Sequence, residues 1–498
     1  MKGFNPPMVS KCSKLLLLFS SILTSTGCAT FSSDGGFKKV ESTSQERLDK
    51  KVSWKRDKEA EKAAQDIINP LLQQQLDVNS AVQIALLNNP GLQAKYAELG
   101  IAEADYVQAG RLANPTLGVS GGVNQEGLHY ATGIEFSLLG LLLIPSATEL
   151  EGIRFEHVKL QAAQETLNLA FEARKAFYSA IASKQLSNYY EQVKLTAEAA
   201  AELSLRMAKA GNISKRDLAR EQVFYSETLS KLSRTKQNEM SEKEKLIRIL
   251  GLNSDQINIK LPEILPNLPA DKMEYEKLIA YAIDQRLDIQ IAKKEIDMFA
   301  KTLGITKATR FINVLNVVME GEKSAADNEV LTGPVLKLEV PLFDFGGARI
   351  ARYQAQYEQS VNHLKETALN AESQVRENYA NYLSKYTDTK RYRDNIIPLR
   401  KKILDETVLH YNGMLVSVFE LLTDAREQVN SLVEYIDTLK EFWIAESDLQ
   451  LAAGGKLPIG TVVKGEEKEN NLAEPDETNV KQQETEKPKI NPHANHKM

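Results

Sequence analysis

Residues 210–218 read AGNISKRDL and residues 411–422 read YNGMLVSVFELL, and each stretch interrupts a long helical pattern. Both contain a glycine, then a serine, then an acid three residues after the serine: Gly211, Ser214 and Asp217 in the first, and Gly413, Ser417 and Glu420 in the second. A glycine past a helix end adopts a left-handed conformation that other residues resist, and a serine followed by an acid starts the next helix. We therefore predict two tight helical-hairpin tips, at about 211–217 and about 413–420, with one extra residue in the second.

The segments that meet at these tips have the length and periodicity of very long helices. Residues 146–210 contain no proline and a single glycine, Gly152, and as a helix they would span roughly 100 Å. Residues 346–412 are similar and are interrupted only by Pro398. Helices of this length cannot enclose one globular core, so we expect them to lie along one another as a coiled coil or a helical barrel.

Two other segments lose the helical period and are predicted to form β-hairpins, at about 114–143 and about 311–341. Glycine and asparagine mark their ends, and polar and apolar residues alternate from Lys337 to Val340. Each strand approaches the ~9–11 residues that a tilted transmembrane strand requires. The longest apolar run after the first residues, from Leu138 to Pro145, is far shorter than the ~18 residues of a membrane-spanning helix. Any crossing of a membrane would therefore use strands.

The first residues are typical of an exported lipoprotein. Residues 1–27 combine lysines with a short apolar run, as in a secretory signal peptide. Their end, Ser-Thr-Gly before Cys28, resembles a bacterial lipobox, although the nearest leucine, Leu23, lies five residues before the cysteine instead of three. We predict that Cys28 is acylated, that Ala29 favours sorting to the outer membrane, and that residues 28–75 form a polar, irregular arm. The alternative is an ordinary signal peptide with an incidental cysteine.

Composition argues against several classes of chemistry. The chain carries 62 Lys and Arg against 67 Asp and Glu, so it lacks the basic excess usual in nucleic-acid-binding proteins. The only cysteines are Cys12, within the signal, and Cys28, which leaves the mature chain without a disulfide or a thiolate metal site. Because no HExxH motif and no phosphate-binding loop occurs, we predict no enzyme, no cofactor and no resident metal. His493, His496 and Met498 suit copper chemically, but such a tail is more often simply solvated.

The order of these features indicates two copies of one plan, which runs helix, hairpin, helix, tip, helix. Repeat 1 would cover residues 76–270 and repeat 2 residues 271–455. The polar residues 456–498 cannot bury a core and are predicted to be disordered. The predicted fold class is therefore mainly α with a small β part: a long coiled-coil barrel of helices plus four membrane strands per chain.

Several separate motifs resemble those of the TolC-like outer-membrane factor family. Residues 76–90, which end in Asn-Pro, resemble its opening helix, and residues 286–289 (RLDI) resemble its Arg-Pro-Asp-Leu. Residues 340–347 (VPLFDFGG) resemble the stretch that leaves the last strand and enters a helix. The two tips resemble Gly-x-x-Ser-x-x-Asp-Leu, from which the second departs by its extra residue and by Glu420. The resemblance covers roughly residues 70–455.

This resemblance implies an outer-membrane subunit of a tripartite efflux system. Each chain of a homotrimer would contribute four strands to one twelve-stranded β-barrel in the outer-membrane lipid, and its helices to a tunnel through the periplasm. An inner-membrane pump, of the resistance-nodulation-division type, would supply the energy. A periplasmic adaptor protein would dock at the tips, against Gly211, Ser214, Gly413 and Ser417.

The acids of the tips are the candidate gate. In a trimer, Glu420 and Asp424 would form two rings at the periplasmic mouth, together with Asp217, and rings of carboxylates favour cations. Lys215 and Arg216 are candidate partners that would hold such a gate closed. The alternative is that these acids only cap their helices, and the two roles are compatible.

Two other functions remain open from the residues alone. A structural coiled-coil lipoprotein of the envelope would explain the long helices and Cys28, but not two matched hairpins. A type I protein secretion channel would explain the hairpins, but the lipobox-like start resembles pump-associated members of the family more than secretion channels. The exported substrate, metal cations or small toxic compounds, is not specified by the sequence.

Overall fold

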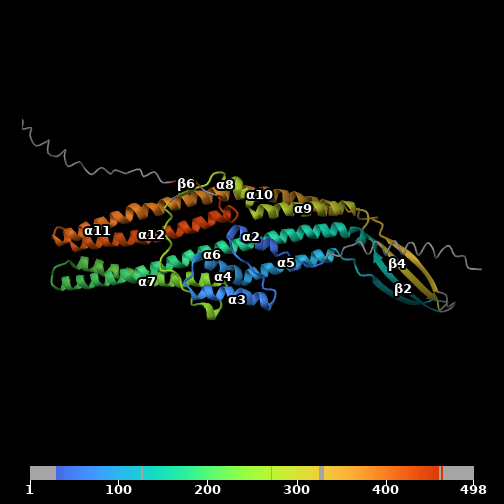
Figure 1. The fold of residues 1–498 in the computed structure, drawn as a ribbon, viewed down its shortest axis with the longest axis horizontal. Coiled ribbons are helices and arrows are strands. Elements are labelled where there is room, and N and C mark those ends of the chain that lie inside the picture. Colours follow the sequence, from blue (N-terminus) through green and yellow to red (C-terminus); the bar gives the residue numbers. More distant parts are fainter. Residues whose placement is uncertain (1–29, 125–126, 271, 325–329, 459–460, 464–498) are drawn as a thin grey trace, which may run out of the picture.

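The computed structural model describes residues 30–124, 127–270, 272–324, 330–458 and 461–463. The molecule is elongated, with a four-stranded sheet at one end and two helical-hairpin tips at the other (Figure 1). The predicted signal peptide, Cys28 and residues 464–498 of the predicted tail, with its histidines, lie outside the described residues.

Helices account for most of the described chain, as predicted. They are α2 (Lys38–Leu48), α3 (Lys58–Gln73), α4 (Val78–Asn88), α5 (Pro90–Ala109), α6 (Leu138–Lys209), α7 (Lys215–Leu250), α8 (Leu278–Gln285), α9 (Leu287–Ala308), α10 (Gly347–Arg391), α11 (Ile397–Asn412) and α12 (Val418–Ala452), with a 3-10 turn η1 (Ser254–Gln256) and a π-helical segment η2 (Tyr392–Ile396). The strands are β1 (Thr116–Asn124), β2 (Gly127–Ser137), β3 (Lys272–Glu274), β4 (Leu315–Ser324), β5 (Val330–Leu338) and β6 (Thr461–Val463). Among the described helices, none combines the length and the apolar character needed to cross a lipid bilayer.

The 72-residue helix α6 runs the length of the molecule from the sheet to the first tip (Figure 1). It begins earlier than predicted because the Ser137 hydroxyl accepts a hydrogen bond from the Gly140 N–H at 3.1 Å and caps the leucine-rich run that follows. That run was predicted to end a β-strand, and this is wrong: its residues form the first turns of α6. In the second half of the chain, α10, η2 and α11 make the equivalent path, with the interruption just before Pro398.

The apolar core lies midway along the molecule, where α2, α4, α6, α10 and α12 pack together. Phe171, Phe177 and Ile181 on α6 are buried there together with Phe442 and Leu449 on α12. Because the core is confined to the middle, both ends of the molecule present long helices or strands with little apolar packing of their own.

The N-terminal region is more ordered than the predicted irregular arm. Its described part contains α2 and α3, and α2 buries Val40 and Leu48. The Arg47 guanidinium donates a hydrogen bond to the Gly454 carbonyl at 2.7 Å, which ties α2 to the end of α12. The prediction failed because only one narrow face of each helix is apolar, so the average composition reads as polar.

The sheet is antiparallel in the order β1-β2-β4-β5. Both predicted hairpins are present with shifted bounds, and β2 pairs with β4 to join them into one sheet. Pro334 lies in β5, an edge strand, where a missing N–H is tolerated. A second, two-stranded sheet pairs β3 with β6, so residues 461–463 of the predicted disordered tail are in fact ordered.

Candidate functional site

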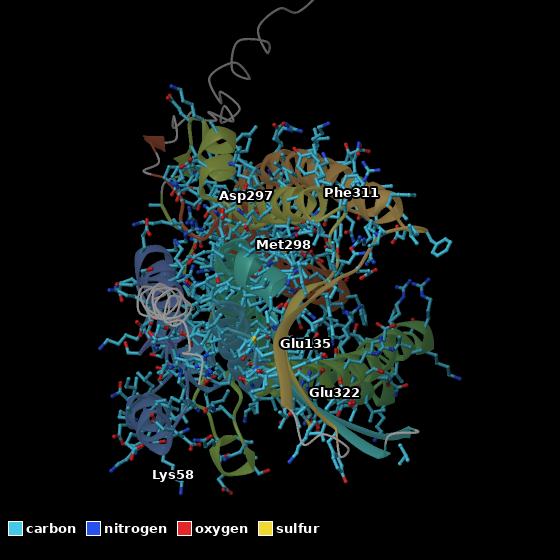
Figure 2. The ribbon with its side chains drawn as sticks, turned by 90° about the vertical axis from the view of Figure 1, so that its right-hand side faces the viewer. Lys58, Glu135, Asp297, Met298, Phe311 and Glu322 are labelled. Atoms are coloured by element: carbon cyan, nitrogen blue, oxygen red, sulfur yellow. The ribbon has the colours of Figure 1, made fainter. Side chains whose placement is uncertain are left out.

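The four-stranded sheet has one apolar and one polar face. Cross-strand pairing aligns Leu117 with Ile134, and Ile134 with Met319, and these side chains are 70%, 43% and 51% exposed. Alternate residues point to the opposite face. There, Glu135 accepts a hydrogen bond from the Lys337 ammonium at 2.8 Å, and Figure 2 shows its position on the sheet. A large exposed apolar face backed by a polar one suits a strand layer between lipid and water.

The two tips lie at the far end of the molecule from this sheet (Figure 1). In the first, Gly211 is left-handed with φ +79°, and the Asn212 N–H donates to the Met207 carbonyl at 2.9 Å. The Ser214 hydroxyl then caps α7 by accepting from the Asp217 N–H at 3.1 Å. Glycine thus ends α6 and serine starts α7 in the order that the sequence indicates.

The Asp217 carboxylate is engaged within its own tip. It accepts a hydrogen bond from the Ser214 hydroxyl at 2.6 Å, and the Arg220 and Arg216 guanidinium groups lie 3.3 Å and 3.5 Å away. The Ser214 bond first, and the two arginines next, hold the pKa of Asp217 below its usual value. In the protomer this acid is therefore bonded to the serine that caps the helix, and of its two predicted partners Arg216 contacts it, whereas Lys215 makes no ion pair with it.

The second tip closes with the same backbone pattern but with another residue in the left-handed position. Met414 has φ +58°, whereas Gly413 has φ −78°. The Leu415 N–H donates to the His410 carbonyl at 2.9 Å. Met414 therefore takes the place of Gly211, three residues before the serine in both tips. The prediction of a left-handed Gly413 and an extra residue is wrong, since residue preference alone does not decide between two neighbours when the penalty is roughly 1–2 kcal/mol.

Glu420 and Asp424 have different surroundings. The Ser417 hydroxyl accepts a hydrogen bond from the Glu420 N–H at 3.3 Å, while the Glu420 carboxylate is exposed and has no partner among the described residues. The Asp424 carboxylate accepts a hydrogen bond from the Thr407 hydroxyl at 2.6 Å, which fastens α12 to α11. Of the two carboxylates, only that of Glu420 has no hydrogen-bond partner among the described residues.

The structure also reveals a contact between the two hairpins that sequence reasoning missed. An Arg426 Nη2 on α12 lies 2.6 Å from a Glu221 Oε1 on α7, and the Arg426 guanidinium stacks over the Phe224 ring at 4.1 Å. The Glu221 side chain is only 2% exposed. We call this contact the latch. A signal was present, because residues 219–223 and residues 425–429 both read Ala-Arg-Glu-Gln-Val, and these two copies contain Glu221 and Arg426.

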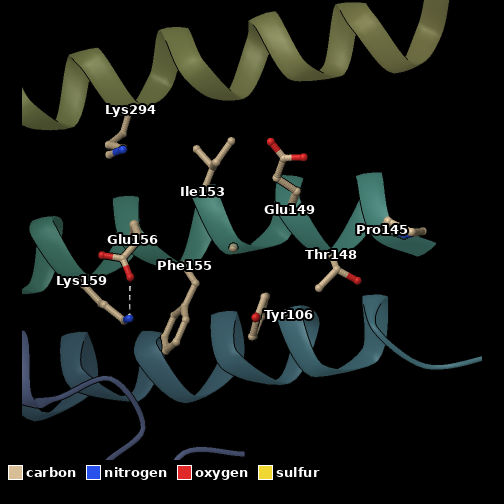
Figure 3. Close-up of a pocket in the computed structure, with 10 residues that line it drawn as sticks. Tyr106, Pro145, Thr148, Glu149, Ile153, Phe155, Glu156, Lys159 and Lys294 are labelled. Carbon is tan, nitrogen blue, oxygen red and sulfur yellow. Dashed lines mark hydrogen bonds and ion pairs between the residues drawn. The ribbon is translucent and has the colours of Figure 1, made fainter. Parts of the chain in front are cut away.

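One groove of about 620 Å³ runs along α6 between α5 and α9 (Figure 3). Tyr106 and Phe155 stack in it with their ring centroids 6.2 Å apart, and Glu156 pairs with Lys159 at 2.7 Å. No group of three or more His, Cys, Asp or Glu in the described part of the chain is placed to hold a metal ion. The groove is lined by an aromatic stack between α5 and α6 and by an ion pair along α6.

Known proteins were compared by sequence and by structure. No protein-family model and no curated protein matches the sequence. Solved structures do match, over 76% of this chain in each case. CusC, which forms a transmembrane channel, is 17% identical with a TM-score of 0.64 over 92% of its length. The Campylobacter jejuni CmeC outer membrane channel is 13% identical with a TM-score of 0.66 over 86%. The open state of the Neisseria gonorrhoeae MtrE outer membrane channel is 15% identical with a TM-score of 0.60 over 89%.

This chain has the fold of outer-membrane channels. At these identities the similarity concerns the fold, and at that level the predicted resemblance to the TolC-like outer-membrane factors is confirmed.

Proposed function

We propose that this chain is the outer-membrane channel subunit of a tripartite efflux system, a passive conduit without enzymatic activity. The observation that carries the proposal is the four-stranded sheet, which has an exposed apolar face and two edges, β1 and β5, without a neighbouring strand in the protomer. In lipid, unpaired strand edges cost several kcal/mol per backbone group. Three copies would remove them by pairing β5 of one with β1 of the next in a twelve-stranded barrel.

In such a homotrimer, the apolar face of the sheet would contact the outer-membrane lipid and the polar face would line the exit. The helices would continue the conduit into the periplasm as a barrel. The tips at the opposite end would meet a periplasmic adaptor protein, around Gly211 and Ser214 in one hairpin and Gly413 and Ser417 in the other. An inner-membrane pump, of the resistance-nodulation-division type, would drive export.

A lipid anchor at Cys28 fits the course of the N-terminal segment. The Ser32 N–H donates a hydrogen bond to the buried Glu103 carboxylate at 2.6 Å, in the half of α5 that leads toward β1. This bond holds Ser32, a residue close to Cys28 in the sequence, on the sheet side of the molecule. This supports acylation as an additional attachment to the same membrane that the strands would cross.

The gate would be built from the second hairpin and held by the latch. Glu420 supplies an unpaired carboxylate at the tip, Asp424 a second acid one turn further on, and Asp217 a third on the first hairpin. Three copies of each would present rings that favour cations. This supports metal cations or small toxic compounds as the exported class, with the choice among them made by the pump.

The proposal is tested with the purified full-length protein in planar lipid bilayers with KCl as the charge carrier. We expect a heat-modifiable trimer on gels, a small single-channel conductance in the wild type, and a larger one when Glu420→Ala and Asp424→Ala are combined. Asp405→Ala with Glu406→Ala removes the same charge from exposed positions of α11 and is the matched control. A protein that stays monomeric and never conducts would refute the channel, and equal conductance in both double variants would refute the gate.

A further inference from the structure

The four connections between the sheet and the helices lie together at one level of the molecule (Figure 1). They lead from α5 to β1, from β2 into α6, from α9 to β4 and from β5 to α10. We call this band the collar and define it as residues 110–115, 138–145, 307–314 and 339–352. Two properties of the collar, its exposed apolar side chains and its charge, point to the same kind of partner.

The collar exposes large apolar side chains at all four connections. The most exposed of them, Phe343, has 97% of its surface open in the protomer. The full set is Leu112, Leu142, Phe311, Ile312, Val314, Val340, Leu342, Phe343 and Phe345. Apolar side chains gathered in one exposed band mark a surface that another molecule or a membrane covers.

This apolar band continues the apolar face of the sheet. Leu336 lies opposite Val317 in the register, on the same face as Met319 two residues further along β4. From Leu336 onward every second residue is apolar and exposed, first within β5 and then beyond its end: Leu336, Leu338, Val340 and Leu342. The face that would contact lipid in the sheet therefore extends into the collar without a break.

The collar also carries positive charge that no carboxylate neutralises. It contains two acids and five cations, which are Arg111, Lys307, Arg310, Arg349 and Arg352. None of the five makes an ion pair within the part of the chain that the structure describes. Just past the collar the pattern is the reverse, because Arg154 on α6 lies 2.6 Å from Glu151 and Lys159 lies 2.7 Å from Glu156. The unpaired cations are thus a property of this band.

Neutral groups hold two of these arginines in place. The Arg310 guanidinium donates a hydrogen bond to the Phe345 carbonyl at 2.8 Å, and the Arg349 guanidinium donates to the side-chain oxygen of Asn313 at 2.6 Å. Such acceptors fix the position of a guanidinium without cancelling its charge, and they leave it further N–H donors. A positioned guanidinium with free donors suits a phosphate group, which accepts several hydrogen bonds at once.

We propose that the collar binds anionic phospholipids in the membrane leaflet that faces the helices. Its cations contact the headgroup phosphates, while Phe343 and its apolar neighbours enter the region of the acyl chains. The inference rests on the proposed channel function, in which the strands cross that membrane, and it adds the class of lipid that the channel recognises. A cation close to an anionic lipid surface favours binding by about fivefold.

A second copy of the chain fits the collar less well than lipid does. In the proposed trimer, neighbouring copies would meet at the edge strands β1 and β5. Leu142 and Phe311 belong instead to the connections beside β2 and β4, the two central strands of the sheet. Because the apolar band runs across all four connections, the partner must cover the whole width of the sheet, as a membrane would.

The recognition of anionic lipid is tested with the full-length protein in phosphatidylcholine bilayers that contain a trace of spin-labelled phosphatidylglycerol or spin-labelled phosphatidylcholine. Electron paramagnetic resonance measures the fraction of each label that the protein surface immobilises. The wild type should prefer phosphatidylglycerol by about fivefold or more. Arg111→Gln, Lys307→Gln and Arg352→Gln combined remove three exposed cations and should reduce the preference to within about twofold of none.

The matched control removes the same charge far from the sheet. Lys231 on α7 and Lys401 and Lys402 on α11 are exposed and make no ion pair among the described residues. Their combined replacement by Gln should leave the lipid preference unchanged. Raising KCl from about 0.1 M to about 1 M supplies a test without any substitution, and screening should then lower the wild-type preference by about threefold or more.

The apolar half of the proposal is tested by fluorescence. Phe343→Trp adds an emitter in the collar, while the native Trp54 and Trp443 pack against the core and give a constant background. Phosphatidylcholine that is brominated along its acyl chains should quench the added emission by about half or more. Leu415→Trp, exposed at the second tip, is the control and should not be quenched.

The outcomes separate the collar from the channel itself. If the trimer conducts but shows no preference for phosphatidylglycerol, or if the triple variant in the collar keeps that preference, the collar is refuted and the channel stands. If Phe343→Trp is not quenched, or if Phe343→Ser dissociates the trimer while the lipid preference is unchanged, the apolar band covers a second copy and the lipid assignment is refuted. A protein that stays monomeric and conducts in no bilayer would refute the proposed function.

Discussion

The latch is the contact whose removal should have the largest effect on the closed state. Glu221 on α7 is 2% exposed and its Oε1 lies 2.6 Å from Arg426 Nη2 on α12, whose side chain is 26% exposed. Replacing Arg426→Ala leaves a buried carboxylate without its counter-charge. The same change also removes the guanidinium from the Phe224 ring, 4.1 Å away.

The size of the effect follows from this burial. Removing one partner of a buried ion pair typically costs about 3–5 kcal/mol. Because Arg426 is partly exposed, we expect a smaller cost for this pair, about 2–3 kcal/mol. Since about 1.4 kcal/mol is tenfold in an equilibrium, each protomer should shift from closed toward open by roughly 30- to 150-fold. Glu221→Ala should shift it less, because Arg426 can turn its charge toward water.

Single-channel recording of Arg426→Ala, Glu221→Ala and the double variant measures this as open probability. The double variant should open no more than Arg426→Ala, because it leaves no unpaired buried charge. Arg400→Ala is the matched control, since its partner Glu427 lies 3.0 Å away within the same hairpin and its loss leaves the two hairpins joined. The reasoning is refuted if Arg400→Ala opens the channel as much as Arg426→Ala, or if the two latch variants add independently.

Three other outcomes are expected. Met414→Gly should raise the free energy of unfolding by about 0.5–1 kcal/mol, because glycine takes the left-handed conformation of this position (φ +58°) without strain. An unchanged or lower melting temperature would contradict this. Leu117→Arg, on the apolar face of the sheet, should make the free energy of membrane insertion about 2–4 kcal/mol less favourable, whereas Ser120→Arg on the opposite face should be tolerated. Equal losses of the two variants from outer-membrane fractions would reject the assignment of faces. Burial lowers the pKa of His157, so the folded state loses stability as the pH falls below the ordinary histidine pKa of 6.5. The fall in melting temperature between pH 7.5 and pH 5 should therefore be smaller in His157→Asn than in the wild type. An equal fall in both proteins would show that His157 does not contribute to the acid sensitivity.

The long helices, the two hairpins and both tips could be predicted from the sequence because each depends on neighbours in the chain. The period of apolar residues in α12, the absence of proline through most of α6, and the Ser214–Asp217 cap are all local patterns. The bounds were less accurate. Leu138 begins a helix instead of ending a strand, since the Ser137 cap outweighs the apolar character of the run.

Where two neighbours could play the same role, local preference was misleading. Gly413 is the expected residue for a left-handed position, but the position belongs to Met414, because the backbone bond from Leu415 to His410 sets where the turn closes. The N-terminal arm was misjudged for a related reason. Val40 and Leu48 form an apolar stripe that is too narrow to indicate a helix in a segment that is otherwise polar. The helix becomes evident only in the folded structure, where another surface covers this stripe.

The sequence by itself determined the long helices, the two β-hairpins and the positions of the two tips, because these follow from spacing and capping within a few turns. Only the tertiary structure decided what those segments meet. The latch joins residues 205 positions apart, the β2–β4 pairing unites two distant hairpins, and the π-helical segment borders a connector held by Arg393. Such contacts form when long helices align side by side, and their register is set by the packing of the whole molecule, which no local pattern records.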